Sequence, residues 1–235
     1  MRLVVLFVLV AGCGKKAAAI ADAAAAPPDA AVVVVPDAAP PLRWVYDGTR
    51  HDDEGPEASV PEKQRVELVQ VGRGRHGDHH VITLEVRMDG KPVDDETVDA
   101  WSAAPFATFG SHLFLVVGPY DKQRGVWLLY GKSATPDPQD LDDALAGPPL
   151  WPLARPGRKG MDRNADDEVV VFSGLIGRWE SICAGYQHPA EESGDSFAWE
   201  RCFAPGVGIT RLEFDSVWGS HELTLVAAPA GFALP

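Results

Sequence analysis

Short apolar runs separated by turn residues fill the chain from Leu42 onward, and this pattern constrains the fold more than any other feature. In His80–Met88 every second residue is apolar: Ile82, Leu84, Val86 and Met88. Such alternation is typical of a half-buried antiparallel strand, because successive side chains point to opposite faces of a sheet. Asp89-Gly90 follows at once and favours a hairpin turn. The pattern predicts a mainly antiparallel β fold with one or two short helices.

The same reasoning along the chain predicts a series of strands and two short helices. The expected strands are Leu42–Asp47, Gln64–Val71, His80–Met88, His112–Val117, Val126–Tyr130, Glu168–Ser173, Arg178–Tyr186, Phe197–Phe203, Val207–Phe214 and Glu222–Ala228. The expected helices are Asp94–Ala104 and Pro138–Ala146, and the last five strands form a meander because their connections are short. The Gly/Arg/His-rich residues between the second and third strands are expected to be a connection. The proline-rich residues 147–157 cannot form an inner strand, because proline has no N–H to donate.

Residues 14–41 consist almost entirely of Ala, Pro, Asp and Val. This low-complexity segment has no aromatic residue and no periodic apolar face, so it cannot bury enough surface to fold. It is expected to be a disordered tether with a root-mean-square reach of about 30 Å. The sequence therefore divides into residues 1–12, an N-terminal linker at 13–41, and a β domain at 42–235 in which an internal boundary near 134–152 stays open.

The first sixteen residues, MRLVVLFVLVAGCGKK, place one cation before a short apolar run, which small residues, a cysteine and two lysines follow. The apolar run is shorter than the ~20 residues that a membrane-spanning helix needs, and the pattern is typical of a cleaved secretory signal. Val10-Ala11-Gly12-Cys13 resembles the lipobox of bacterial lipoproteins. The resemblance implies that residues 1–12 are removed and that Cys13 is acylated. An ordinary signal peptide with a chance cysteine is the alternative.

The resemblance also implies where the protein resides. Lipoproteins of this family carry three acyl chains, and two or more chains anchor a protein firmly to a membrane. Gly14 follows Cys13 where an inner-membrane retention signal would place Asp, so the outer membrane of a Gram-negative host is expected, with the domain facing the periplasm or the cell surface. The formal net charge of −13 argues against nucleic acid as a partner, because phosphates would repel the chain.

Cys183 and Cys202 are the other two cysteines of the chain. Because an exported domain lies in an oxidising compartment, a disulfide between them is expected. If the two face each other, the hairpin centre falls between Glu192 and Ser193, within the turn-like segment HPAEESGDS. This register would place Ile182, Ala184 and Tyr186 on the core face together with Trp199, Arg201 and Phe203.

Trp199–Glu213 (WERCFAPGVGITRLE) resembles a segment that recurs in bacterial lipoproteins, in which an APGVG step joins two strands. Leu150–Gly157 (LWPLARPG) is similar to the start of the same module, so the resemblance covers residues 148–228. It implies an antiparallel curved sheet or half-barrel and indicates no activity. Gly206 and Gly208 suit a bend or bulge, because glycine adopts positive φ at little cost.

Two groups of residues have the composition of metal sites. Asp162, Asn164 and Asp166 have the spacing of a calcium loop, but Asp167 stands where the sharp turn needs Gly and Ser173 where Glu would ligate. An acidic loop is therefore favoured over a calcium site. His76, His79 and His80 offer imidazole ligands, but adjacent strand residues point to opposite faces, so a polar hairpin connection is favoured.

No catalytic residue is predicted. His221-Glu222 begins like a zincin helix, but Leu225 occupies the position of the second histidine, and Gly194-Asp195-Ser196 lies in an expected hairpin tip instead of a nucleophile elbow. No cofactor motif is present in the sequence, so none is expected.

The seven tryptophans could line a groove for an apolar or amphipathic ligand, or they could simply fill a small β core: Trp44, Trp101, Trp127, Trp151, Trp179, Trp199 and Trp218. The sequence leads us to expect a membrane-anchored envelope lipoprotein whose exported β domain is a binding or structural module. Its expected partners are the membrane, through the acyl chains on Cys13, and such a ligand or another envelope protein. The alternative is an envelope hydrolase or another enzyme without a recognisable motif.

Overall fold

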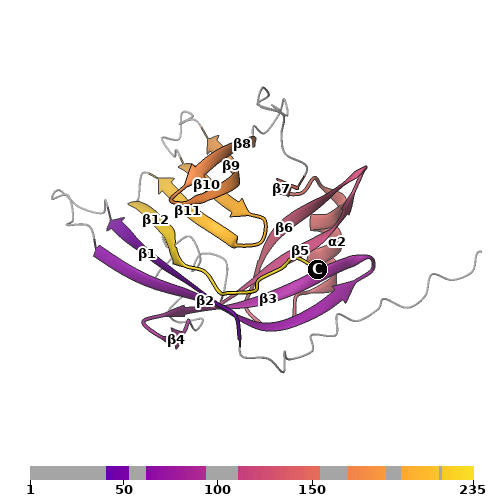
Figure 1. Cartoon of the computed structure of the whole chain (residues 1–235), viewed down its shortest axis with the longest axis horizontal. Coiled ribbons are helices and arrows are strands. Elements are labelled where there is room, and N and C mark those ends of the chain that lie inside the picture. The colour runs from indigo at the N-terminus through magenta and orange to yellow at the C-terminus, as the bar shows by residue number, and fades with distance from the viewer. Residues whose placement is uncertain (1–40, 53–61, 94–110, 154–168, 189–196, 217–218) are drawn as a thin grey trace, which may run out of the picture.

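The computed structural model describes residues 41–52, 62–93, 111–153, 169–188, 197–216 and 219–235. These residues form one antiparallel sheet and one helix (Figure 1). The elements are β1 (Arg43–Asp52), β2 (Glu62–His76), β3 (His79–Met88), β4 (Lys91–Pro92), β5 (His112–Tyr120), β6 (Gln123–Gly131), α2 (Pro138–Ala146), β7 (Trp151–Pro152), β8 (Val170–Ile176), β9 (Trp179–His188), β10 (Phe197–Ala204), β11 (Gly208–Ser216) and β12 (Gly219–Ala227).

The strand order is β7-β6-β5-β3-β2-β1-β12-β11-β10-β9-β8, with β4 added beside β3. The first and last strands of the domain pair in the middle of this order, where Thr49 lies opposite Glu222. The sheet curves into a nearly closed barrel, and β7 and β8 are its two ends (Figure 1). The expected fold class, a mainly β and strongly curved antiparallel sheet, is confirmed.

Trp151 of β7 occupies the seam between the two ends of the sheet. Its indole is fully buried, stacks on Phe203 of β10 with 5.1 Å between ring centroids, and donates a hydrogen bond to the carbonyl oxygen of Arg201 at 3.0 Å. A second buried indole, that of Trp44, donates to the carbonyl oxygen of Val207 at 2.5 Å. Large side chains from both halves of the sheet therefore fill the barrel interior.

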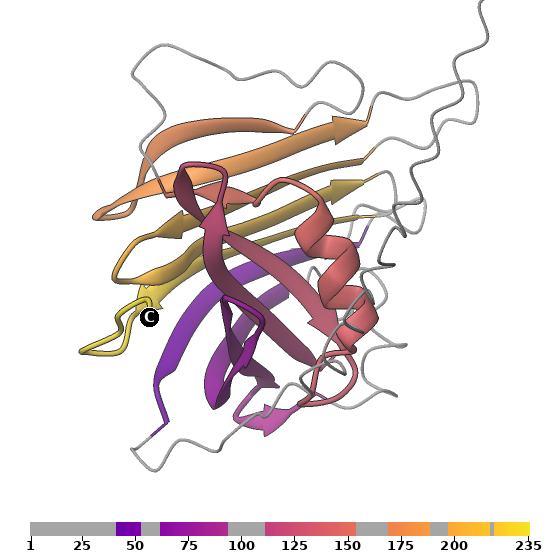
Figure 2. The same cartoon turned by 90° about the vertical axis from the view of Figure 1, so that its right-hand side faces the viewer.

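The helix α2 covers part of the outer surface of the barrel, over β5 and β6 (Figure 2). Asp137 caps its N-terminus by accepting a hydrogen bond from the backbone N–H of Gln139, and Leu141 is its buried anchor. Leu141 packs in a second apolar cluster with Phe114 and Trp127. The helix predicted at Pro138–Ala146 is confirmed. No helix among the described ranges is both long and apolar enough to cross a membrane.

The meander predicted for the last third of the chain is confirmed as β8–β12. Gly206 and Gly208 have φ of +81° and +107° at the β10–β11 connection, and a bulge lies beside it between Cys202 and Phe203. The proline-rich stretch contributes only the two-residue strand β7 at one end of the sheet, in agreement with the prediction that it is not an inner strand.

The connection predicted between the second and third strands is wrong. β2 continues to His76 and β3 begins at His79, so the connection is only the tight turn Gly77-Asp78. Continued pairing satisfies the backbone hydrogen bonds of this Gly- and Arg-rich segment, and that outweighs its low strand propensity. The helix predicted at Asp94–Ala104 lies outside the described residues.

Candidate functional site

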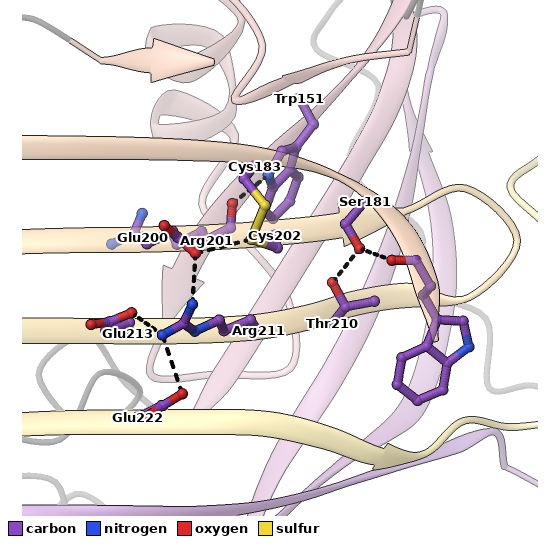
Figure 3. Close-up of a disulfide and its surroundings, with 11 residues drawn as sticks. Trp151, Ser181, Cys183, Glu200, Arg201, Cys202, Thr210, Arg211, Glu213 and Glu222 are labelled. Carbon is purple, nitrogen blue, oxygen red and sulfur yellow. Dashed lines mark hydrogen bonds and ion pairs between the residues drawn. A yellow bond between two sulfur atoms is a disulfide. The ribbon is translucent and has the colours of Figure 1, made fainter. Parts of the chain in front are cut away.

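The two cysteines lie opposite each other on β9 and β10, with their sulfur atoms 2.11 Å apart and both side chains buried (Figure 3). The register predicted from this pairing is therefore confirmed. The predicted core face is confirmed for Ile182, Ala184 and Phe203, which are buried. On the same face Tyr186, Trp199 and Arg201 are only partly buried, and the Arg201 guanidinium lies 4.5 Å from the Trp199 ring centroid.

Removing the disulfide with Cys183→Ala and Cys202→Ala is expected to lower the free energy of unfolding by about 3 kcal/mol. The bond closes a loop with a sequence separation of 19, so its loss gives the unfolded chain more conformational freedom. Urea titration of both proteins measures the change. Peptide mapping without reductant that finds both thiols free in the native protein would contradict the disulfide itself.

The disulfide lies on the outer face of the sheet beside a cluster of four charged residues. The Arg211 guanidinium is 3.2 Å from a carboxylate oxygen of Glu200, 2.5 Å from Glu213 and 3.2 Å from Glu222 (Figure 3). The three glutamates occupy directly opposed positions on β10, β11 and β12. Like charges in such positions destabilise a sheet, and one arginine neutralises only one of the three.

The surroundings of Glu213 disfavour its charged form. Burial raises the pKa of the Glu213 carboxyl above its ordinary value, and the Arg211 guanidinium acts against this rise. Three neighbouring carboxylates add to the rise: those of Glu200, Glu222 and Asp215. The cluster therefore carries more negative charge than its one cation balances.

A groove of about 920 Å³ runs over the outer face beside this cluster. We call it the acidic groove, and it is lined by Val170, Phe172, Gly185, Tyr186, Gln187, Ala198, Trp199, Glu200, Glu213 and Asp215. Gly185 stands between Val170 and Glu200 in one row of the sheet, and its missing side chain deepens the groove. The stacked rings of Tyr186 and Trp199 project from the opposite, interior face, so Phe172 is the aromatic side chain on the face of the groove. The groove thus combines apolar and aromatic surface with three carboxylates.

Two smaller depressions exist among the described residues. One of about 630 Å³ lies over β1, β2 and β12 and is lined by charges of both signs, including Lys63 and Arg65. The other, of about 290 Å³, lies between β6 and α2. Because no aromatic side chain lines the first and the second is small, the acidic groove is the strongest candidate site.

The three histidines do not converge on one point. His76 Nε2 lies 2.6 Å from a carboxylate oxygen of Asp142 in α2, whereas the His79 ring packs edge-on against Trp127 at 5.3 Å. His80 lies opposite Arg75 in the β2–β3 pair. Within the described part of the chain, the one cluster of potential metal ligands is Cys183, Glu200 and Cys202, whose two sulfur atoms already form the disulfide.

The residues considered for catalysis hold structural positions where they are described. His221 is buried in strand β12 beside Gln64, with 3.3 Å between His221 Nδ1 and Gln64 Nε2, so its segment is not a zincin helix.

Several predicted sites lie outside the described residues: the lipidation site Cys13, the calcium candidate Asp162, Asn164 and Asp166, and the segment Gly194-Asp195-Ser196. Among the described tryptophans, Trp44, Trp127 and Trp151 are buried, whereas Trp179 and Trp199 are partly buried and pack against the interior cluster. The use considered for them as core residues is therefore the one that the described part of the chain shows.

No family model, no curated protein and no solved structure matches this chain.

Sequence reasoning did not find the acidic groove. Its residues come from four strands, β8 to β11, and only the register brings them together. One signal was available once the Cys183–Cys202 register was assumed, because it places Gly185 opposite Glu200 on the face away from Ile182.

Proposed function

We propose that this protein is an envelope lipoprotein whose β domain is a binding module for amphipathic cations, with the acidic groove as its binding site. Acyl chains on Cys13 would hold it to the outer membrane, and residues 14–41 would let the domain reach a ligand away from the lipid. The observation that carries the proposal is the combination in one groove of an apolar, aromatic surface and unbalanced carboxylates.

Packing favours a site on the outer face. Ligand-binding barrels hold their cargo inside, but here indole and phenyl rings fill the interior, including Trp44, Trp151 and Phe203. The outer groove offers Val170 and Phe172 to an apolar group. A ligand would bury its apolar part there without displacing any core residue.

Charge favours a cationic ligand. The chain as a whole carries a formal charge of −13, and around Arg211 three glutamates meet one cation. Opposed glutamates on neighbouring strands cost stability, and sequences depart from local rules in this way mainly at functional sites. An ammonium or guanidinium group bound beside Glu213 and Asp215 would relieve the repulsion.

We expect phenethylammonium to bind the groove in a saturable manner and phenethyl alcohol, its neutral analogue, to bind at least about tenfold more weakly, because a charge-assisted contact contributes about 1.5–3 kcal/mol. Isothermal titration calorimetry measures both affinities, with the full chain in zwitterionic lipid nanodiscs and empty nanodiscs as the blank.

Two further variants test the groove itself. Glu213→Gln combined with Asp215→Asn should abolish the preference for the cation, while Arg211 keeps Glu200 and Glu222 as partners. Gly185→Val should weaken both ligands, because a Cβ at Gly185 is in ordinary contact, 3.5 Å from the Trp199 oxygen, and the added methyl groups would fill the groove. Equal affinity of the two ligands for the wild-type protein would contradict the proposed function.

A further inference from the structure

Strand β8 forms one end of the sheet. Within the described part of the chain β8 pairs only with β9, and its sequence VVFSGLI contains no charged residue and no proline. Leu175 is 69% exposed. Edge strands normally carry charges, prolines or bulges that block pairing with another chain, and β8 has none of them. We call the unpaired side of Val170–Ile176 the β8 edge.

The register shows which backbone groups the β8 edge presents. Cys183 and Cys202 have Cα atoms 4.0 Å apart, the close spacing of a pair without mutual backbone hydrogen bonds, so the peptide groups of Cys183 point toward Phe172. The hairpin of β8 and β9 agrees with this assignment. Its two-residue turn, with Gly177 at φ +57°, is flanked by the hydrogen-bonded pair Ile176 and Trp179. Phe172 lies four residues from Ile176 along β8, so its pair with Cys183 is hydrogen-bonded as well. The alternation then directs the N–H and C=O groups of three residues toward the open side: Val171, Ser173 and Leu175.

The β8 edge is continuous with the acidic groove. Val170 and Phe172 of β8 line the groove, and Gly185 of β9 leaves the way open to Glu200 of β10. A strand added to β8 would lie three strand spacings, about 14 Å, from Glu200. An extended lysine or arginine and a glutamate side chain together span this distance.

Resting on the proposed function of the acidic groove, we propose that its ligand is an extended segment of a basic polypeptide, which adds a strand to the β8 edge. Its backbone would pair with Val171, Ser173 and Leu175, and this mode of recognition is β-augmentation. Basic side chains on its outer face would lean across Gly185 toward Glu200, the carboxylate of the groove nearest to β8, and apolar side chains on its other face would lie beside Leu175.

Charge decides between this occupant and a second copy of the chain. Two copies would each bring a formal charge of −13, and pairing at β8 would bring two acidic grooves close together. A basic segment meets the opposite charge instead, which favours both its encounter and its alignment.

The test uses the full chain in zwitterionic nanodiscs and the peptide KVKVKVK, whose lysines and valines occupy opposite faces of a strand. Ser173→Pro removes an N–H of the β8 edge without breaking a bond to β9, and Ser173→Ala is the matched control that keeps it. We expect Ser173→Pro to lower the affinity for the peptide at least tenfold and Ser173→Ala to leave this affinity unchanged. Both variants should bind phenethylammonium as the wild type does. A KVKVKVK peptide N-methylated at alternate residues should likewise fail to bind the wild type.

Other outcomes overturn the inference in distinguishable ways. Equal binding of KVKVKVK to Ser173→Pro, or undiminished binding of the N-methylated peptide, would rule out strand addition and leave the groove's proposed function standing. Failure of the wild type to bind phenethylammonium would contradict the proposed function as well. Slow hydrogen exchange at Val171, Ser173 and Leu175 before peptide is added would mean that the chain itself covers the edge. A cross-linked dimer that Ser173→Pro abolishes would identify a second copy as the occupant.

Discussion

Replacing Trp151 with alanine is expected to lower the free energy of unfolding by about 3–5 kcal/mol, the range for truncating a buried tryptophan. Trp151 is fully buried, stacks on Phe203 and bonds to the carbonyl oxygen of Arg201, so one side chain joins β7 to β10 across the seam. Its loss leaves a cavity where the two ends of the sheet meet. Urea denaturation followed by circular dichroism measures the change.

Two controls show whether the effect comes from the seam. Trp151→Phe keeps a ring against Phe203 and loses the N–H donor. We expect it to lower the free energy of unfolding less than Trp151→Ala does, but by at least about 1 kcal/mol for the lost hydrogen bond. Trp179→Ala removes the same side chain from a partly exposed position in β9 and should cost markedly less than Trp151→Ala. If the free energy of unfolding of Trp151→Ala lies within about 1 kcal/mol of the wild-type value, the seam does not depend on this residue.

Replacing Cys13 with serine is expected to abolish acylation and to leave residues 1–12 attached to the chain. The lipobox resemblance implies that the signal is removed only after Cys13 is modified. Mass spectrometry of the native protein should show a chain that begins at an acylated Cys13, and of the variant a chain that keeps residues 1–12.

The control for Cys13 is the pair Cys183→Ala and Cys202→Ala, which removes the other two cysteines and should leave acylation unchanged. An unmodified amino terminus at any residue downstream of Cys13 in the native protein would contradict the anchor. In that case the ordinary signal peptide would be the correct interpretation.

Local pattern was sufficient for most strands but not for their ends. The alternation in His80–Met88 and the turn Asp89-Gly90 predicted β3 and its termination, and both glycine positions of the APGVG step have positive φ as expected. The error at residues 72–79 arose because Gly72 and Gly74 signal a connection locally, whereas pairing with β3 keeps them in the ladder. Propensity is a local quantity, but pairing is decided by the partner strand.

Closure of the sheet could not be predicted from the sequence. It depends on the pairing of Thr49 with Glu222, which no local pattern encodes, and on Trp151, which the sequence places only in a proline-rich crossing. The acidic groove was missed for the same reason. Glu200 and Glu213 lie on different strands, and they are close together only because the register of β10 and β11 places them opposite each other.

Amide chemical shifts of the deuterated full chain in nanodiscs locate phenethylammonium on the protein. We expect saturable shifts at Phe172, Gly185, Ala198 and Glu213 on the outer face, with little change at the interior residues Tyr46 and Leu223. Saturable shifts confined to the interior, or no shifts at those four groove amides, would contradict a binding site in the acidic groove.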